Sequence, residues 1–173
     1  MEKEIINRVA NSPIKTINLE DLYVSGERVL MDLKDNLHQG LILKEKDFRA
    51  FVKNHNWSVY QGKHVAVYCS VDAILPTWAY MLLATRLEPF AKTIVFGNLE
   101  RLEEELFLTA LKKINPEDYK DQKVVIKGCS KIHVPVSIYV EITRKLRPFA
   151  SSIMYGEPCS TVPLYKKGKK PIR

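Results

Sequence analysis

Three cysteines, each followed directly by a serine, are the residues of this sequence whose type and spacing best suit chemistry. The pairs are Cys69-Ser70, Cys129-Ser130 and Cys159-Ser160. Thiolates select zinc, cuprous copper or iron–sulfur clusters over hard cations. We therefore expect a site in which the three thiols bind an iron–sulfur cluster or a zinc ion. The cluster is favoured because it tolerates wider spacing between its ligands.

Other side chains close to the cysteines in sequence can complete such a site. His133 follows Cys129 by four residues and is a candidate nitrogen ligand. Asp72 and Glu157 are candidate acids or bases if the site forms a pocket. The side chains expected around the ligands are Ser70, Asp72, Ser130, Glu157 and Ser160. No residue is assigned a catalytic role.

The same cysteines allow two interpretations without a metal. Free cysteine commonly packs at a strand end as a small buried apolar side chain. The protein would then be an interaction module or a homodimer with structural cysteines. Alternatively, a cysteine of low pKa at a helix N-terminus can accept a persulfide or form a transient disulfide. Both alternatives stay open beside the metal hypothesis.

The cysteines follow short apolar segments that alternate with helical patterns. Apolar runs at residues 64–69, 93–96, 123–126 and 152–155 suit strands buried on both faces of a parallel sheet. Helical spacing covers residues 76–88, 99–114 and 135–146. The sequence therefore predicts an α/β fold with a mainly parallel sheet. Because the carboxyl ends of parallel strands share one edge, we expect all three thiols at that edge.

An internal repeat organises these segments. Residues 87–97 resemble residues 146–156, a shift of 59 positions, and we expect duplicated strand–helix–strand units at 64–98 and 123–157. Residues 1–60 carry patterns for a helix at 2–10, a strand at 28–33 and a helix at 44–55. This region is interpreted as an N-terminal extension packed on a single domain, and residues 166–173 as a basic tail.

Composition limits the class of protein. The chain has 173 residues, of which 46% are hydrophobic and 27% charged, typical of one globular domain. No apolar run approaches the roughly 18 residues of a membrane span. The charged first residues do not suit a signal peptide, and an odd number of cysteines argues against a disulfide framework, so we expect a cytoplasmic protein.

Charge and motifs also bear on the partners. Much of the net charge of +7 lies in the basic tail, so we expect no nucleic-acid partner. The sequence contains no Gly-x-Gly-x-x-Gly or Walker-type loop, which disfavours a nucleotide cofactor of the usual kind. A protein partner or a second copy of the chain remains compatible with the pattern.

Four stretches of the sequence carry distinctive motifs. They are GLILKEKDFR at residues 40–49, PTWAYM at 76–81, VVIKGC at 124–129 and MYGEPCSTVP at 154–163. These stretches resemble an uncharacterised bacterial family, domain of unknown function 2480, over nearly the whole chain. The resemblance implies an accessory role in iron–sulfur cluster assembly, with Cys69, Cys129 and Cys159 as the matching positions. It implies no substrate and no reaction.

Overall fold

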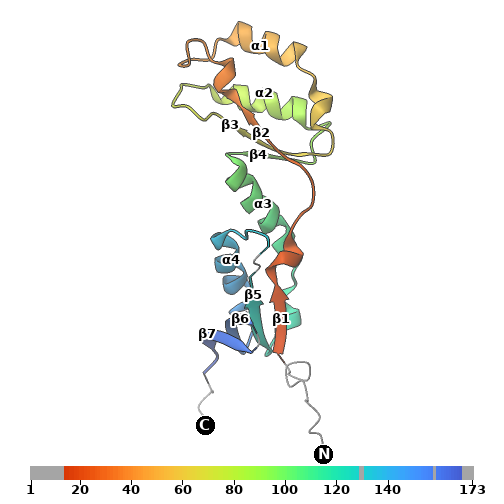
Figure 1. Ribbon diagram of the computed structural model, residues 1–173, viewed down its shortest axis with the longest axis vertical. Helices are drawn as coiled ribbons and strands as arrows, with labels where there is room; N and C mark the ends of the chain where they lie inside the picture. The colour runs from red at the N-terminus through yellow and green to blue at the C-terminus, as the bar shows by residue number, and fades with distance from the viewer. Residues whose placement is uncertain (1–13, 129–130, 158, 169–173) are drawn as a thin grey trace, which may run out of the picture. The chain divides into compact units, whose positions relative to one another are not determined.

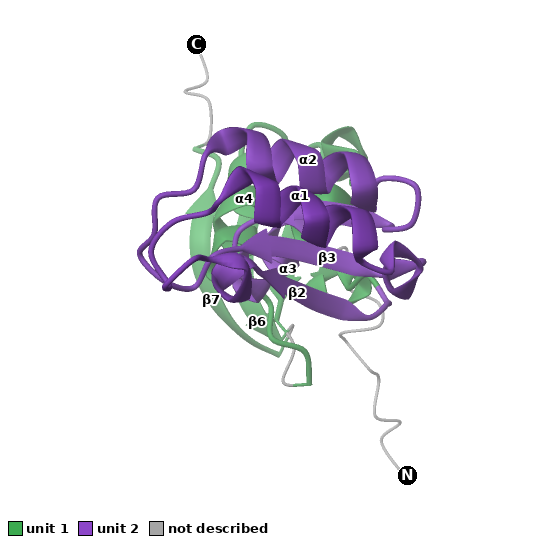
Figure 2. Cartoon of the chain, turned by 90° about the horizontal axis from the view of Figure 1, so that it is seen from above, with its two compact units in different colours: residues 1–24, 106–173 green, residues 25–105 purple. Residues whose placement is uncertain are grey.

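The computed structural model describes residues 14–128, 131–157 and 159–168, which fold as two compact units (Figure 1). Unit 1 comprises Met1–Val24 and Leu106–Arg173, and unit 2 comprises Ser25–Glu105. Unit 2 is therefore an insertion in the chain of unit 1, as the two colours of Figure 2 show. The expected α/β class with mainly parallel strands is confirmed, but the strands form two sheets rather than one.

Unit 2 contains a three-stranded, fully parallel sheet with the strand order β2-β3-β4, which we call sheet B. Its strands are β2 (Arg28–Asp32), β3 (His64–Tyr68) and β4 (Thr93–Phe96). Its helices are α1 (Glu45–Asn54) and α2 (Thr77–Leu87), with short 3-10 helices η2 (Leu33–Asn36) and η3 (Trp57–Tyr60).

The core of unit 2 lies between sheet B and its two helices, which cover the same face of the sheet (Figure 1). Phe48 of α1 and Leu83 of α2 are fully buried in the same core cluster as Val65 and Val67 of β3. Burial of each such side chain contributes about 1.5–3 kcal/mol. Helix α2 ends at Leu87 because Pro89, two residues later, has no N–H group to continue the helical hydrogen bonds, although Glu88 itself keeps helical dihedral angles.

Unit 1 contains a four-stranded sheet with the order β1-β5-β6-β7, which we call sheet A. The strands β1 (Ile14–Asn18), β5 (Lys123–Lys127) and β6 (Ser152–Glu157) are parallel, and β7 (Ser160–Lys166) returns antiparallel to β6. The other elements are α3 (Leu99–Leu111), α4 (Val136–Leu146), η1 (Leu19–Leu22) and η4 (Pro116–Tyr119). The boundary between the two units falls inside α3, between Glu105 of unit 2 and Leu106 of unit 1.

The elements of the two units follow the same order and spacing. The segment η3, β3, α2, β4 of unit 2 recurs as η4, β5, α4, β6 of unit 1, and each element of the second series begins 59 residues later, as with His64 and Lys123. In both units a strand followed by a 3-10 helix pairs in parallel with a strand of the repeated segment: β2–η2 with β3, and β1–η1 with β5. The spacing of the sequence repeat therefore appears in the element bounds.

The region expected to be an N-terminal extension supplies parts of both sheets. Its residues form β1 of sheet A and β2 and α1 of unit 2. The predicted helix at residues 2–10 lies outside the described residues, as does the basic tail from residue 169 onward. No helix among the described residues is long and apolar enough to cross a membrane.

Candidate functional site

The carboxyl ends of β5 and β6 lie side by side in unit 1, because these strands are adjacent and parallel. Lys127, the last residue of β5, forms an ion pair with Glu157, the last residue of β6, with 2.9 Å between Nζ and Oε1. In the sequence, Cys129 follows Lys127 by two residues and Cys159 follows Glu157 by two residues. Two of the three predicted ligands therefore follow neighbouring strand ends.

The two loops at this edge carry most of the predicted site residues. The loop after β5 contains the sequence positions of Cys129, Ser130 and His133, and the turn after β6 contains Cys159, with Ser160 beginning β7. Cys159, Ser160 and His133 are exposed. Cys129 and Ser130 lie outside the described residues. Of the predicted groups, the described part of unit 1 thus contains His133, Cys159 and Ser160 near these strand ends, besides the ion-paired Glu157.

Two tyrosines approach the same strand ends. The rings of Tyr139 on α4 and Tyr155 on β6 meet edge to face, with 5.9 Å between their centroids. A Cβ atom placed on Gly128 would lie 2.5 Å from the Tyr139 hydroxyl and 3.5 Å from the Tyr155 hydroxyl. Only glycine at position 128 admits the Tyr139 hydroxyl this close to the backbone. Both hydroxyls therefore lie close to Gly128, the residue that precedes Cys129 in the sequence.

Two buried oxygen atoms in unit 1 lack a hydrogen-bond partner among the described residues. They are Oδ1 of Asn18, at the carboxyl end of β1, and Oγ of Ser137, in the first turn of α4. Both elements meet the edge where β5 ends, since β1 pairs with β5 in parallel and α4 follows it. A buried oxygen without a hydrogen bond costs about 1–3 kcal/mol, so this edge has unused capacity to bind a polar group.

An apolar groove of about 370 Å³ adjoins this edge. Its lining consists of Ile126, Tyr139, Thr143, Tyr155 and Leu164. Sequence analysis did not predict this groove because Leu164 comes from β7, a strand that its periodicity did not indicate. Its lining offers an apolar surface beside Ile126, the residue before the last one of β5.

Cys69 lies in unit 2, directly after β3, and is only 8% exposed. Its thiol donates a hydrogen bond to the carbonyl oxygen of Val71, with 3.5 Å between sulfur and oxygen. Burial raises the pKa of the Tyr80 phenol, and the neighbouring Cys69 thiol and Tyr68 add to the rise. The ring of Tyr80 packs edge to face on Phe96 at 5.1 Å. This arrangement resembles the pair Tyr139–Tyr155 of unit 1, but here the cysteine is packed in the core.

Asp32, at the end of β2, holds the loop that follows Cys69. Its Oδ1 accepts hydrogen bonds from the backbone N–H groups of Ser70 and Lys34, each at 3.1 Å. Burial by itself would raise the pKa of Asp32, but the hydrogen bonds and the Lys34 charge outweigh it and lower the pKa. Sequence analysis missed this residue; its signal is an acid as the last residue of a mainly apolar strand. Ser70 and the predicted Asp72 are exposed.

The two-sheet architecture changes the argument for a common edge. Sheet B carries Cys69, whereas Cys159 and the sequence position of Cys129 belong to unit 1, so one continuous sheet does not gather the three thiols. Within the described part of the chain, no three His, Cys, Asp or Glu side chains form a group that could hold a metal ion. The three-cysteine site stays a prediction.

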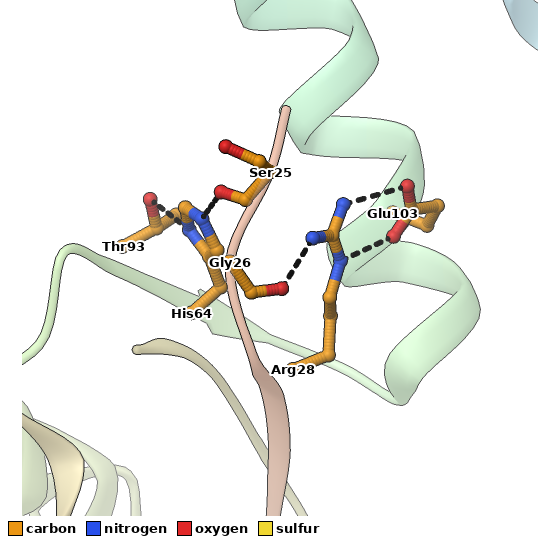
Figure 3. A network of polar contacts seen from close by, with 6 residues as sticks. All are labelled: Ser25, Gly26, Arg28, His64, Thr93 and Glu103. Carbon is orange, nitrogen blue, oxygen red and sulfur yellow. Dashed lines mark hydrogen bonds and ion pairs between the residues drawn. The ribbon is translucent and has the colours of Figure 1, made fainter. Parts of the chain in front are cut away.

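A separate polar network lies at the amino edge of sheet B (Figure 3). His64, 1% exposed, donates from Nε2 to the Ser25 carbonyl at 3.1 Å, and its Nδ1 lies 3.0 Å from the Thr93 hydroxyl. Arg28 forms a two-pronged ion pair with Glu103 of α3 at 2.9 and 3.0 Å. Both ring nitrogens of His64 are engaged, so this network stabilises the fold and presents no free ligand.

A comparison with family models matches residues 3–167 to a family described as "Protein of unknown function (DUF2480)". The match includes all four stretches that carry the sequence resemblance, which is thereby confirmed. No curated protein and no solved structure matches the chain significantly.

Proposed function

This chain belongs to the DUF2480 family of proteins of unknown function, and we propose that its unit 1 binds an iron–sulfur cluster or a zinc ion at the carboxyl edge of sheet A. The ligands are the thiolates of Cys129 and Cys159, with the imidazole of His133 as a further ligand. The observation that carries the proposal is the pairing of Lys127 with Glu157, because each of these strand ends precedes a cysteine by two residues.

The spacing of adjacent strands suits this chemistry. Neighbouring strands are about 4.8 Å apart, and a Zn–S bond is about 2.3 Å long, so two thiolates from adjacent loops can share one ion or one cluster. Soft sulfur ligands favour both centres over hard cations. His133 is exposed on the loop before α4. Its side chain is therefore free of core packing, and a ring nitrogen can turn toward the cysteines.

Groups around the proposed ligands support binding at this edge. The hydroxyls of Tyr139 and Tyr155, next to Gly128, can donate hydrogen bonds to thiolates. The unpartnered Oδ1 of Asn18 and Oγ of Ser137 add polar atoms to the same edge. Thiols that serve as metal ligands must stay reduced, so the proposal places the protein in the cytoplasm.

The proposal extends to an accessory role in iron–sulfur assembly. Three protein ligands on a cluster would leave one iron position open, and an open position lets a cluster be received or passed to another protein. The groove of about 370 Å³ beside this edge gives an apolar surface next to such a position.

The test is anaerobic purification of the full chain, followed by visible absorbance and by analysis of iron, sulfide and zinc. We expect stoichiometric metal in the wild type and its loss in Cys129→Ser and in Cys159→Ser. The matched control is Thr85→Ala, which removes an exposed hydroxyl on α2 of unit 2 and should retain the metal. Cys69→Ser tests whether the third predicted cysteine contributes.

Two results would overturn the proposal. The first is a metal-free wild-type protein. In that case, fast alkylation of Cys159 would favour thiol chemistry, and unreactive thiols would favour an interaction module. The second is metal that both serine variants retain in full. Circular dichroism of each variant separates loss of a ligand from loss of the fold.

A further inference from the structure

A second cavity opens at the opposite, amino edge of sheet A, away from the proposed metal ligands. Its volume is about 420 Å³. The residues that line it are Ile14, Lys123, Ser151, Ser152, Met154, Pro163, Tyr165, Lys166 and Lys167. Three lysines, two serines and a tyrosine therefore surround one hollow, and none of these lining residues is acidic.

The strand register explains why the polar groups converge. Lys123 of β5 is opposite Ser152 of β6, and Ser152 is opposite Lys166 of β7. Side chains in one such row point to the same face of a sheet. Because adjacent strands are about 4.8 Å apart, the two lysine backbones are about 10 Å apart. The Ser152 hydroxyl lies between them, and an anion can sit between the two ammonium groups.

The charge in this cavity is largely uncompensated. Lys167 forms an ion pair with Asp121 at 3.0 Å. Neither Lys123 nor Lys166 has an acidic partner among the described residues, and both are exposed. Their backbones are about 10 Å apart, which is beyond the Debye length of about 8 Å, so salt screens most of their mutual repulsion. An anion between the two ammonium groups would lie within that length of both.

The remaining lining is apolar and gives the cavity two kinds of surface. Ile14, Met154 and Pro163 contribute apolar side chains. Ligand pockets have volumes of about 300–1,000 Å³ and combine apolar walls with few polar groups, and this cavity fits that description.

We propose that the cavity at the amino edge of sheet A binds a phosphorylated small molecule with a flat apolar body, of the size of a mononucleotide. The phosphate lies between Lys123 and Lys166 over the Ser152 hydroxyl, and the apolar body lies against Met154 and Pro163. The site needs no metal and is independent of the proposed thiolate centre, so either proposal can fail without the other.

The test is a titration of the isotope-labelled full chain, followed by amide NMR shifts, with inorganic phosphate, adenosine monophosphate and adenosine as probes. We expect the monophosphate to shift the amides of Ser151 and Ser152, inorganic phosphate to do so more weakly, and adenosine to leave them unchanged. Raising the salt concentration should weaken binding. A single-stranded oligonucleotide serves as a fourth probe.

Matched variants locate the phosphate. Lys123→Gln and Lys166→Gln should each lower the affinity for adenosine monophosphate about two- to fivefold, as expected for exposed ion pairs. The double variant should lower it about tenfold. Lys46→Gln, the same charge change on α1 of unit 2, should leave the affinity unchanged. Well-dispersed amide spectra of the variants show that they fold.

Three results would overturn this proposal. One is the absence of shifts at these amides with both phosphate-bearing probes. Another is equal affinity of the double variant and the wild type. The third is an affinity for the oligonucleotide that grows with its length and exceeds that for the monophosphate, which would identify a nucleic-acid surface.

Discussion

Replacement of Gly26 by alanine tests the packing of unit 2 around its buried histidine. Gly26 has a φ of +134°, and a Cβ atom there would lie 2.8 Å from Nε2 and 2.9 Å from Cδ2 of His64. The ring cannot turn away without losing its hydrogen bond to the Ser25 carbonyl (Figure 3). The substitution therefore combines backbone strain with a displaced buried ring.

The size of the effect can be worked out from these two parts. A side chain in the left-handed region costs about 1–2 kcal/mol, and a buried donor left without its acceptor costs about 1–3 kcal/mol. We expect Gly26→Ala to lower the free energy of unfolding by about 3 kcal/mol. Gly40→Ala is the matched control: its φ is +70° and nothing lies within 4 Å of the added Cβ, so about 1 kcal/mol is expected.

Urea unfolding followed by tryptophan fluorescence measures this difference. Both tryptophans of the chain, Trp57 and Trp78, lie in unit 2, so the signal reports on that unit. With a slope of about 1 kcal/mol per molar urea, the midpoint should fall by about 3 M for Gly26→Ala and by about 1 M for Gly40→Ala. Equal midpoints for the two variants would refute the argument that His64 occupies the space above Gly26.

Further predictions concern an ion pair, a carboxylate and two thiols. Glu103→Gln should lower the free energy of unfolding by about 1 kcal/mol, measured by the same fluorescence, because it removes the charge from the two-pronged contact with Arg28, whose side chain is 14% exposed; an unchanged midpoint would contradict this. The pKa of Asp32 is lowered in the folded protein, so its carboxylate stabilises the fold above its unfolded pKa of about 4 and this stabilisation is lost as the pH falls through the lowered value. The urea midpoint of the wild type should therefore exceed that of Asp32→Asn by the largest amount at about pH 7, and this difference should shrink below about pH 4. A difference that grows in acid would contradict a lowered pKa for Asp32. In native protein, iodoacetamide should label Cys159 before Cys69, as followed by mass spectrometry of peptides, because the first thiol is exposed and the second is 8% exposed; labelling in the opposite order would show that the burial of Cys69 is wrong.

Local patterns in the sequence were sufficient for most individual elements. The predicted strand at 93–96 matches β4 in its bounds, and the predicted helices at 76–88 and 135–146 match α2 and α4 to within one residue at each end. These segments carry their signals locally, in apolar β-branched runs, in prolines before the helices and in prolines after them. The same patterns predicted Cys159 just after a strand, as found, and Cys69 as the last residue of a strand, whereas β3 ends one residue earlier at Tyr68.

Strand pairing could not be obtained in this way. β1 pairs with β5 although Ile14 and its partner Lys123 are more than a hundred positions apart, with all of unit 2 between them. The pattern at β1 is short and half exposed, and β7 contains a proline and lies at the sheet edge, so neither shows the periodicity of a buried strand.

The sequence by itself determined the α/β class and the spacing of the repeated elements. Only the tertiary structure decided that the strands divide into two sheets, that Cys69 belongs to a different unit from Cys159, and that Lys123 and Lys166 flank one serine. The physical reason is that periodicity records which face of an element is apolar, whereas the partner of that face depends on contacts between residues distant in the chain.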